Sequence, residues 1–324
     1  MTQAATLSLI ICIIGWSVVL WRFIKSRQKR YLLLIIPLLL VTIPVSAAFW
    51  YTHRDRPNSE MRLLFDGITY HRDVRNDPRP MIAHIITVDL TNPRIQFLVT
   101  PTNNIEGFAL PARTTSQFLD DFGLQIAING DFFDPWRDYG PWDYYPHSGD
   151  GVNTRGLSAS IGTIYTRGFM NGNAYSTLYI SADNRVSFNE PVGAVYNAIS
   201  GYLTIVRDGA LNISPNRDVA YKTTPHPRTV VALNQAGTEL IFVLVDGRQP
   251  NYSEGATLYE VAQIVIDYGG YTALNLDGGG SVTLAMQSED GTSELLNSPV
   301  HGRIPGRERP IANHLGVYAP RLQE

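Results

Sequence analysis

The segment from Ala273 to Thr283, ALNLDGGGSVT, holds the densest group of residues suited to chemistry. An apolar run ends at Asp277, three glycines follow, and Ser281 adds a hydroxyl. Consecutive glycines can turn several backbone N–H groups to one side and form a nest that binds an anion. The segment is not a Walker loop, because it lacks the lysine, and it is not a nucleophile elbow, because Thr283 occupies a position that needs glycine. A tight glycine turn between two strands is the alternative interpretation.

A second polar cluster follows the apolar segment Gln125 to Ile128. It contains Asn129, Asp131 and Asp134, and local capping of a turn is the alternative role for Asp131. The loop beyond is rich in aromatic residues, which suit the apolar faces of sugar rings but could equally pack to hold the loop. These aromatic residues are Phe132, Phe133, Trp136, Tyr139, Trp142, Tyr144 and Tyr145.

Two arginines also stand at predicted strand ends. Arg228 precedes an apolar run, and Arg248 follows Asp246 and Gly247 at the end of another. Guanidinium groups match phosphate oxygens in bidentate fashion, although a surface ion pair is the ordinary role of a single arginine. Functional groups gather on one rim of a sheet. We therefore expect one cleft to contain Asp131, Arg228, Asp246, Arg248 and Asp277.

Composition excludes several classes of site. The only cysteine is Cys12, within the first apolar stretch, so cysteine nucleophiles, disulfides and zinc–cysteine sites are excluded from the remainder. A net charge of −3 provides no basic field for nucleic acid. There is no HExxH and no EF-hand loop. No cofactor is expected to be required. Calcium held by oxygen ligands of the acidic loop Asp131 to Asp150 is the metal that the composition allows, and no metal ligand can be assigned.

The pattern after residue 80 predicts mainly strands. Alternating apolar residues in 86–90 and 95–99 predict a hairpin with one buried face. The continuous run Leu240 to Val245 predicts a central strand that is buried on both sides. Two helices are predicted, each beginning at a threonine that forms a capping box with a residue three positions later. They begin near Thr114, with Gln117, and at Thr257, with Glu260. The fold class is α+β, a sheet-dominated single globular domain with few helices.

The first 52 residues predict a membrane anchor. Residues 4–21 and 31–51 carry no charge, and roughly 20 apolar residues cross a bilayer core as a helix. The basic residues between them would stay cytoplasmic, which places the later domain outside the cytoplasm. Cleavage at Val45 to Ala48, whose small residues resemble a signal-peptidase site, is the alternative. Residues 53–80 are expected to be a linker and entry segment, and residues 81–320 the catalytic domain. The basic residues are Arg22, Lys25, Arg27, Lys29 and Arg30.

The order and spacing of these motifs resemble the phosphodiester glycosidase family over roughly Ile82 to Tyr318. The matching elements are NGDFF at 129–133, PRT at 227–229, VDGR at 245–248, GxTLxExA at 255–262, LNLDGGGS at 274–281 and RPxxNxLGV at 309–317. The resemblance implies a sugar-1-phosphodiester substrate within a glycan or glycoconjugate.

On this resemblance the catalytic carboxylates are expected among Asp277, Asp131 and Asp246. Substrate or phosphate would be bound by Asn129, Arg228, Arg248, Gly278, Gly279, Gly280, Ser281, Arg309 and Asn313. Two other functions stay open: a cell-envelope module that binds anionic polysaccharide without turnover, and a metal-dependent phosphodiesterase that cuts the P–O bond.

Overall fold

The computed structural model describes residues 3–26, 35–168, 175–214 and 219–322. The chain forms two compact units, one of Met1–Arg56 with Gln249–Tyr252, and one of Pro57–Arg248 with Ser253–Glu324. The first unit contains helices α1 (Gln3–Ser26) and α2 (Ile35–Thr52). Among the described residues, no helix combines the length and hydropathy of a membrane span. The predicted transmembrane hairpin is therefore not supported, and Arg27, Lys29 and Arg30 of its basic loop lie outside the described residues.

An antiparallel eight-stranded sheet is the largest sheet of the second unit. In spatial order its strands are β1 (Glu60–Phe65), β2 (Ile68–Arg75), β3 (Met81–Asp89), β19 (Glu239–Val245), β18 (Arg228–Asn234), β20 (Gly270–Asn275), β16 (Thr204–Arg207) and β17 (Ala210–Leu211).

Four further sheets complete the strands described in this unit. The first has the order β22 (Ser293–Leu295), β21 (Leu284–Gln287), β6 (Ile126–Asn129), β23 (His314–Tyr318) and β4 (Gln96–Val99). The second has the order β12 (Thr163–Arg167), β11 (Leu157–Ser160), β15 (Asn197–Tyr202), β13 (Tyr175–Ile180) and β14 (Val186–Phe188). The small ones are β5 (Leu110–Pro111), β10 (Gly151–Thr154) and β7 (Phe133–Asp134), and the pair β8 (Arg137–Asp138) and β9 (Tyr144–Tyr145).

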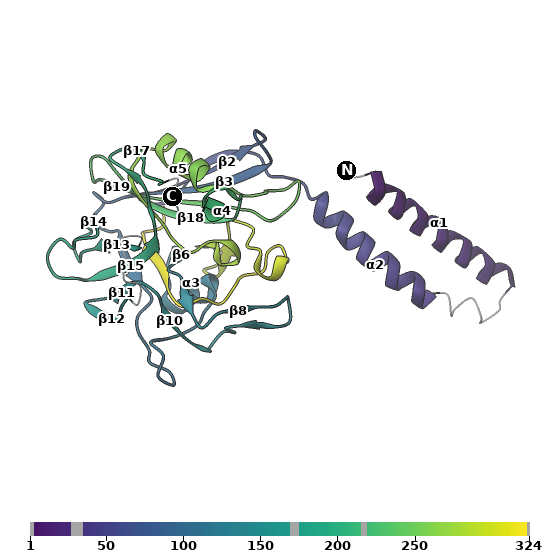
Figure 1. The fold of residues 1–324 in the computed structure, drawn as a ribbon, viewed down its shortest axis with the longest axis horizontal. Helices are drawn as coiled ribbons and strands as arrows, with labels where there is room; N and C mark the ends of the chain where they lie inside the picture. The colour runs from purple at the N-terminus through teal and green to yellow at the C-terminus, as the bar shows by residue number, and fades with distance from the viewer. Residues whose placement is uncertain (1–2, 27–34, 169–174, 215–218, 323–324) are drawn as a thin grey trace. The chain divides into compact units, whose positions relative to one another are not determined.

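Apolar residues cover both faces of the eight-stranded sheet. One face packs under helix α5 (Leu258–Asp267), through side chains such as Val243 and Val261. The other face packs against the sheet that contains β6 and β23, through side chains such as Phe242 and Ile128. Figure 1 shows α5 and β6 on opposite sides of strand β18. Helices α3 (Thr115–Phe122) and α4 (Val219–Thr223) are short. The prediction of a sheet-dominated α+β domain with few helices is confirmed.

Much of the segment 53–80, expected to be a linker and entry segment, is regular structure. Residues 60–75 form the hairpin β1–β2, and β2 pairs with β3 along its whole length. Ile68 and Tyr70 are fully buried, so this segment is part of the core. The hairpin predicted for residues 86–99 is also wrong. Its first half, in β3, pairs with β2 and β19, whereas its second half, β4, pairs with β23 in another sheet.

Local sequence signals located the two predicted helices and the central strand correctly. Thr114 and Thr257 are the N-caps of α3 and α5, and both capping boxes form with Gln117 and Glu260. Strand β19 lies between β3 and β18, and its residues from Leu240 to Val245 are buried. Capping depends only on neighbours along the chain, which explains why it could be recognised without the fold.

We predict that Thr257→Ala lowers the free energy of unfolding by about 1 kcal/mol, because the Glu260 amide loses the side chain that accepts from it. Thr257→Ser keeps the hydroxyl and should lose much less. Urea unfolding of the three proteins measures both differences. Equal losses in the two variants would show that the threonine methyl group, rather than the cap, stabilises the helix.

Candidate active site

A cavity of about 390 Å³ opens where β18 begins and β20 ends. Because β18 runs antiparallel to both of its neighbours, its first residue, Arg228, lies beside the last residues of β19 and near those of β20. The cavity wall combines aromatic, basic and acidic side chains. It consists of Phe132, Phe133, Trp136, Tyr221, Arg155, Arg228, Arg248, Arg309, His226, Asp138, Asp277 and the three glycines 278–280.

Asp277 presents the carboxylate that follows β20. One oxygen accepts from the Gly278 amide at 2.8 Å, and the other accepts from the Ser281 hydroxyl at 2.6 Å. Burial raises the pKa of the Asp277 carboxyl, and the hydrogen bond from Ser281 and the charge of Arg309 oppose this shift. The predicted binding residue Ser281 is itself buried, so its hydroxyl orients the carboxylate.

The glycine loop, residues 278–280, serves a different purpose from the predicted nest. Two of its three amides already donate within the protein, Gly278 to the Asp277 side chain and Gly279 to the Pro227 carbonyl, and the next amide, of Ser281, donates to the Gly278 carbonyl. A Cβ on residue 279 would lie 2.9 Å from an Arg248 nitrogen, and one on residue 280 would lie 2.7 Å from an Arg309 nitrogen. The glycines therefore allow two guanidinium groups to lie directly on the loop, and these groups supply the positive charge.

Arg228 is a buried, fixed cation in the cavity wall. Its Nε donates to the Ala256 carbonyl at 3.1 Å, and its Nη2 donates to the carbonyls of Tyr221 at 2.6 Å and Thr224 at 3.2 Å. The guanidinium carbon also lies 4.6 Å from the centre of the Tyr221 ring. Most of its hydrogen-bonding capacity is used inside the protein, so it contributes chiefly a fixed positive charge.

Two carboxylates of the aromatic loop hold arginines of the cavity. Asp138 accepts from Arg309 at 3.0 Å, and Asp134 accepts from Arg155 through both oxygens at 2.7 and 2.8 Å. Trp136 lies against the Arg309 guanidinium, with 5.4 Å between ring centre and carbon. The loop thus has a second role beyond offering aromatic faces, because it orients cations.

Asp131 lies outside the cavity lining and is completely buried. Its Oδ2 accepts from the Gly156 amide at 2.6 Å, while its Oδ1 has no hydrogen-bond partner among the described residues. Burial raises the pKa of Asp131 well above its usual range; the Gly156 hydrogen bond opposes this, and the charge of Asp277 adds to it. A backbone hydrogen bond from Asp277 to the Gly130 carbonyl joins the two segments.

The two asparagines predicted to bind substrate are buried, and their side chains form hydrogen bonds that connect separate segments of the chain. Asn129 donates to the Asp277 carbonyl at 2.8 Å and accepts from Thr229 and the Thr283 amide. Asn313 accepts from the Asp131 amide at 2.8 Å. Neither asparagine lines the cavity. Each side chain is buried and forms hydrogen bonds with backbone groups that would otherwise be buried without a partner.

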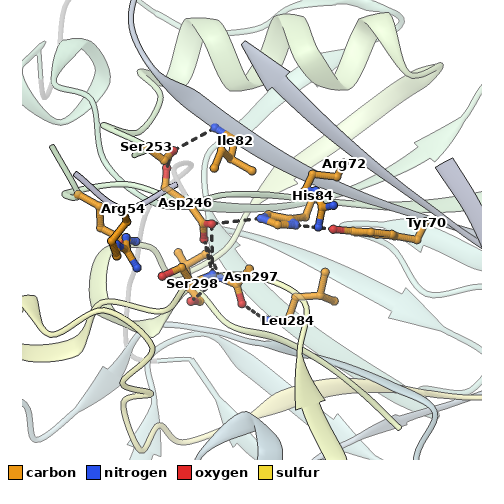
Figure 2. Close-up of polar contacts among 12 residues, drawn as sticks. Arg54, Tyr70, Arg72, Ile82, His84, Asp246, Ser253, Leu284, Asn297 and Ser298 are labelled. Atoms are coloured by element: carbon orange, nitrogen blue, oxygen red, sulfur yellow. Dashed lines mark hydrogen bonds and ion pairs between the residues drawn. The ribbon is translucent and has the colours of Figure 1, made fainter. Parts of the chain in front are cut away.

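Asp246 does not join the predicted cleft. It follows Phe242 and Leu244 in the alternation of β19, and both of these pack in the core between the sheets. Figure 2 shows its carboxylate with His84 at 3.2 Å, the Asn297 amide at 3.0 Å and the Ser298 backbone. His84 in turn contacts the Tyr70 hydroxyl at 2.9 Å. This network attaches residues 297–298 to the sheet.

Sequence reasoning missed four residues of the cavity wall: Asp138, Arg155, Tyr221 and His226. His226 directly precedes the PRT motif at 227–229, and this motif was the available signal. Burial and the charges of Arg248 and Arg228 lower the pKa of His226 to about 4, so its ring is neutral at neutral pH. Arg155 and Tyr221 stand in segments without a recognisable motif, and only the fold brings them to the site.

Four of the carboxylates in the acidic loop Asp131 to Asp150 are paired with basic side chains. Asp143 pairs with Arg137 and Asp150 with His147, in addition to the two pairs described above. Among the residues that the structure describes, no group of three or more His, Cys, Asp or Glu side chains is placed to hold a metal ion.

Residues 122–318 match the phosphodiester glycosidase family. This range is more than half of the chain and includes every residue that lines the cavity. The chain belongs to this family. It is therefore a glycosidase that acts on a glycosyl phosphodiester. No curated protein matches the sequence significantly.

Solved structures share the fold at low sequence identity. The catalytic domain of zebrafish N-acetylglucosamine-1-phosphodiester α-N-acetylglucosaminidase, auto-inhibited by its pro-peptide, has a TM-score of 0.57 at 21% identity, over 82% of this chain and 85% of that one. A protein from Synechocystis has a TM-score of 0.53 at 18% identity, over 82% and 64%. A protein from Burkholderia pseudomallei has a TM-score of 0.50 at 13% identity, over 77% and 76%.

The raised pKa of Asp131 predicts a specific pH dependence of stability. Its contribution is fully present below the unfolded pKa of about 3.9 and is lost as the pH rises through the higher folded pKa. Asp131→Asn removes this loss while keeping the shape of the side chain. We expect the melting temperature of the variant, relative to wild type, to increase between about pH 4 and pH 7. Asp183→Asn, on an exposed turn, is the control and should show no such increase. A pH-independent difference for Asp131→Asn would mean that Asp131 is ionised in the fold.

Proposed function

We propose that the second unit hydrolyses the bond between the anomeric carbon and the phosphate of a sugar-1-phosphodiester in a glycan or glycoconjugate. One observation carries this proposal. The Asp277 carboxylate lines a cavity that is also lined by four arginines, and the other carboxylate of the wall, Asp138, is paired with Arg309. A carboxylate complements the positive charge that develops at the anomeric carbon, and cations complement the departing phosphate.

The phosphate side of the reaction is assigned to Arg248 and Arg309, with the buried charge of Arg228 behind them. A phosphodiester leaves as an anion and needs less protonation than an alkoxide. Fixed cations can therefore replace a general acid as the main stabilisation of the leaving group. This agrees with the low pKa of His226, which leaves its ring neutral and unable to act as a proton donor near pH 7.

The carboxylate side of the reaction is assigned to Asp277, as the group that activates water or stabilises the anomeric carbon. Asp131 is assigned a supporting role. Burial and the charge of Asp277 raise its pKa and so favour its neutral form, which lowers the repulsion between two buried carboxyl groups. Asn129 and Ser281 hold the Asp277 segment in position.

Asp277→Asn should lower turnover by about 100-fold or more, because a positioned catalytic carboxylate is replaced by a neutral amide. Its affinity for an uncleaved diester analogue should change little, because the arginines remain. Hydrolysis of a panel of sugar-1-phosphodiesters by the full chain measures the first quantity, and calorimetric titration measures the second. Asp183→Asn is the matched exposed control.

Water labelled with ¹⁸O identifies the bond that breaks. Label in the sugar supports attack at carbon, whereas label in the phosphate would replace the proposal with a phosphodiesterase, as would a requirement for metal revealed by a chelator. Binding of the diesters without any turnover in the wild type would instead favour a polysaccharide-binding module. Unchanged turnover in Asp277→Asn would remove Asp277 from the reaction.

The position of this unit outside the cytoplasm is proposed from the sequence alone. Support comes from the two uncharged stretches 4–21 and 31–51 and the basic residues between them. A glycan or glycoconjugate substrate in the cell envelope is consistent with that location. Attachment to the membrane through these stretches is part of the same proposal.

A reporter fused after Glu324 tests this location. We expect a reporter that is active only outside the cytoplasm to be active, because the basic cluster retains the connecting loop inside. Replacing the five basic residues with glutamine should reduce this activity. A reporter that works only in the cytoplasm would reject the proposed topology.

A further inference from the structure

A second cavity, of about 640 Å³, adjoins the active-site cavity. The two share Asp138, His226 and Arg248 as lining residues. The rest of the second wall comes from the turn between β8 and β9, at Tyr139 to Pro141, and from the turn η3 (His301–Arg303). Asp277 lines only the first cavity. The two cavities thus share Arg248, but only the first offers the Asp277 carboxylate to a ligand.

The wall of the second cavity is held by specific contacts. Arg307 donates to the Pro141 carbonyl at 2.7 Å, and its guanidinium carbon lies 4.8 Å from the centre of the Tyr144 ring. Gly302 approaches so closely that an added Cβ would lie 3.2 Å from the Cα of Pro141. Across the hairpin, the Tyr139 amide donates to the Asp143 carbonyl at 2.9 Å. The β8–β9 turn is therefore fastened to η3.

The second cavity has an excess of positive charge. Its arginines are Arg248 and Arg303. Both line the same cavity. Desolvation and the charges of Arg309 and Arg303 lower the pKa of Arg248, and the charges of Asp138 and Asp277 oppose this shift. Asp138, the acidic residue of the lining, pairs with Arg309. Arg303 is exposed and forms no ion pair within the described part of the chain.

The turn of the β8–β9 hairpin also exposes aromatic surface. Tyr139 is 79% exposed and Trp142 is 87% exposed. Such rings in a short turn cannot contribute to the core, but they can cover the apolar face of a sugar or a polyol chain. The second cavity therefore combines one exposed cation, one shared cation and an aromatic edge.

We propose that the second cavity is the subsite for the alcohol side of the diester and that it selects alcohols carrying a second anionic group, a phosphate or a carboxylate. The inference rests on the proposed function. The anomeric carbon must face Asp277 in the first cavity, and the scissile phosphate then lies at Arg248. The alcohol on the far side of that phosphate enters the second cavity, where Arg303 meets its anion. The substrate class is accordingly a repeating sugar–phosphate chain or an acidic glycan.

Three diesters of one sugar test the subsite, with glycerol, glycerol 3-phosphate or glyceric acid as the alcohol. We expect wild type to prefer the two anionic alcohols in kcat/KM. Arg303→Ala should lower kcat/KM for the anionic diesters about tenfold, mainly through KM, and bring their ratio to the glycerol diester close to one. Arg207→Ala, an exposed arginine on β16 that lines neither cavity, is the control and should preserve the preference. A preference for glycerol 3-phosphate alone would identify a phosphate chain, and equal preference would identify a general anion site.

Calorimetric titration of the same diesters separates the subsite from the reaction. An Arg303-dependent preference in binding, without turnover, would keep the subsite and overturn the hydrolase. Turnover without any preference for the anionic alcohols would keep the hydrolase and overturn the subsite. Equal losses for all three diesters in Arg303→Ala would also overturn it. Melting temperatures confirm that Arg303→Ala and Arg207→Ala are folded.

Discussion

A buried carboxylate at the end of β20 is the constraint on which the rest of the site depends. Moving a charged group out of water is costly unless hydrogen bonds and opposite charges compensate. For Asp277 the compensation comes from the Gly278 amide, the Ser281 hydroxyl and Arg309. The Arg309 guanidinium lies directly against residue 280, where an added Cβ would be 2.7 Å from its Nη2. The carboxylate, the glycines and the arginine are therefore parts of one electrostatic arrangement.

Hydrogen bonds of a buried asparagine join the eight-stranded sheet to the sheet that contains β6 at this same point. Asn129, at the end of β6, binds the Asp277 carbonyl, Thr229 of β18 and the Thr283 amide. Each of these groups would cost free energy if it were buried without a partner. Apolar residues of both sheets form a continuous core between them. The position of Asp277 is thus fixed by the packing of the sheets, which gives the site a rigid base.

Local signals predicted the parts of this protein that depend on local interactions. Both capping boxes, the buried strand Leu240 to Val245 and the residues at the ends of β18 and β20 could be identified, because caps and alternation need no knowledge of the fold. The side to which a side chain points beyond the end of a strand could not be predicted. Asp246 and Arg248 are two residues apart, yet the first faces the core and the second lines the cavity, which follows from the turn beyond β19, where Arg248 has a φ of 58°. The pairing of β4 with β23 and the arrival of Arg155 and Tyr221 depend on contacts distant in sequence, for which no local pattern exists.

The β8–β9 hairpin connects the two cavities through adjacent residues. Asp138 orients Arg309 in the first cavity, and Tyr139 lines the second. Gly302 of η3, which ends at Arg303, lies directly against Pro141 of this hairpin, and Arg307 binds the Pro141 carbonyl. A ligand that spans both cavities would contact the hairpin on each side of the scissile phosphate. Contact of the alcohol side with the hairpin would therefore stabilise the Asp138–Arg309 pair beside the scissile phosphate, and binding energy from the distant group would contribute to departure of the phosphate from the anomeric carbon.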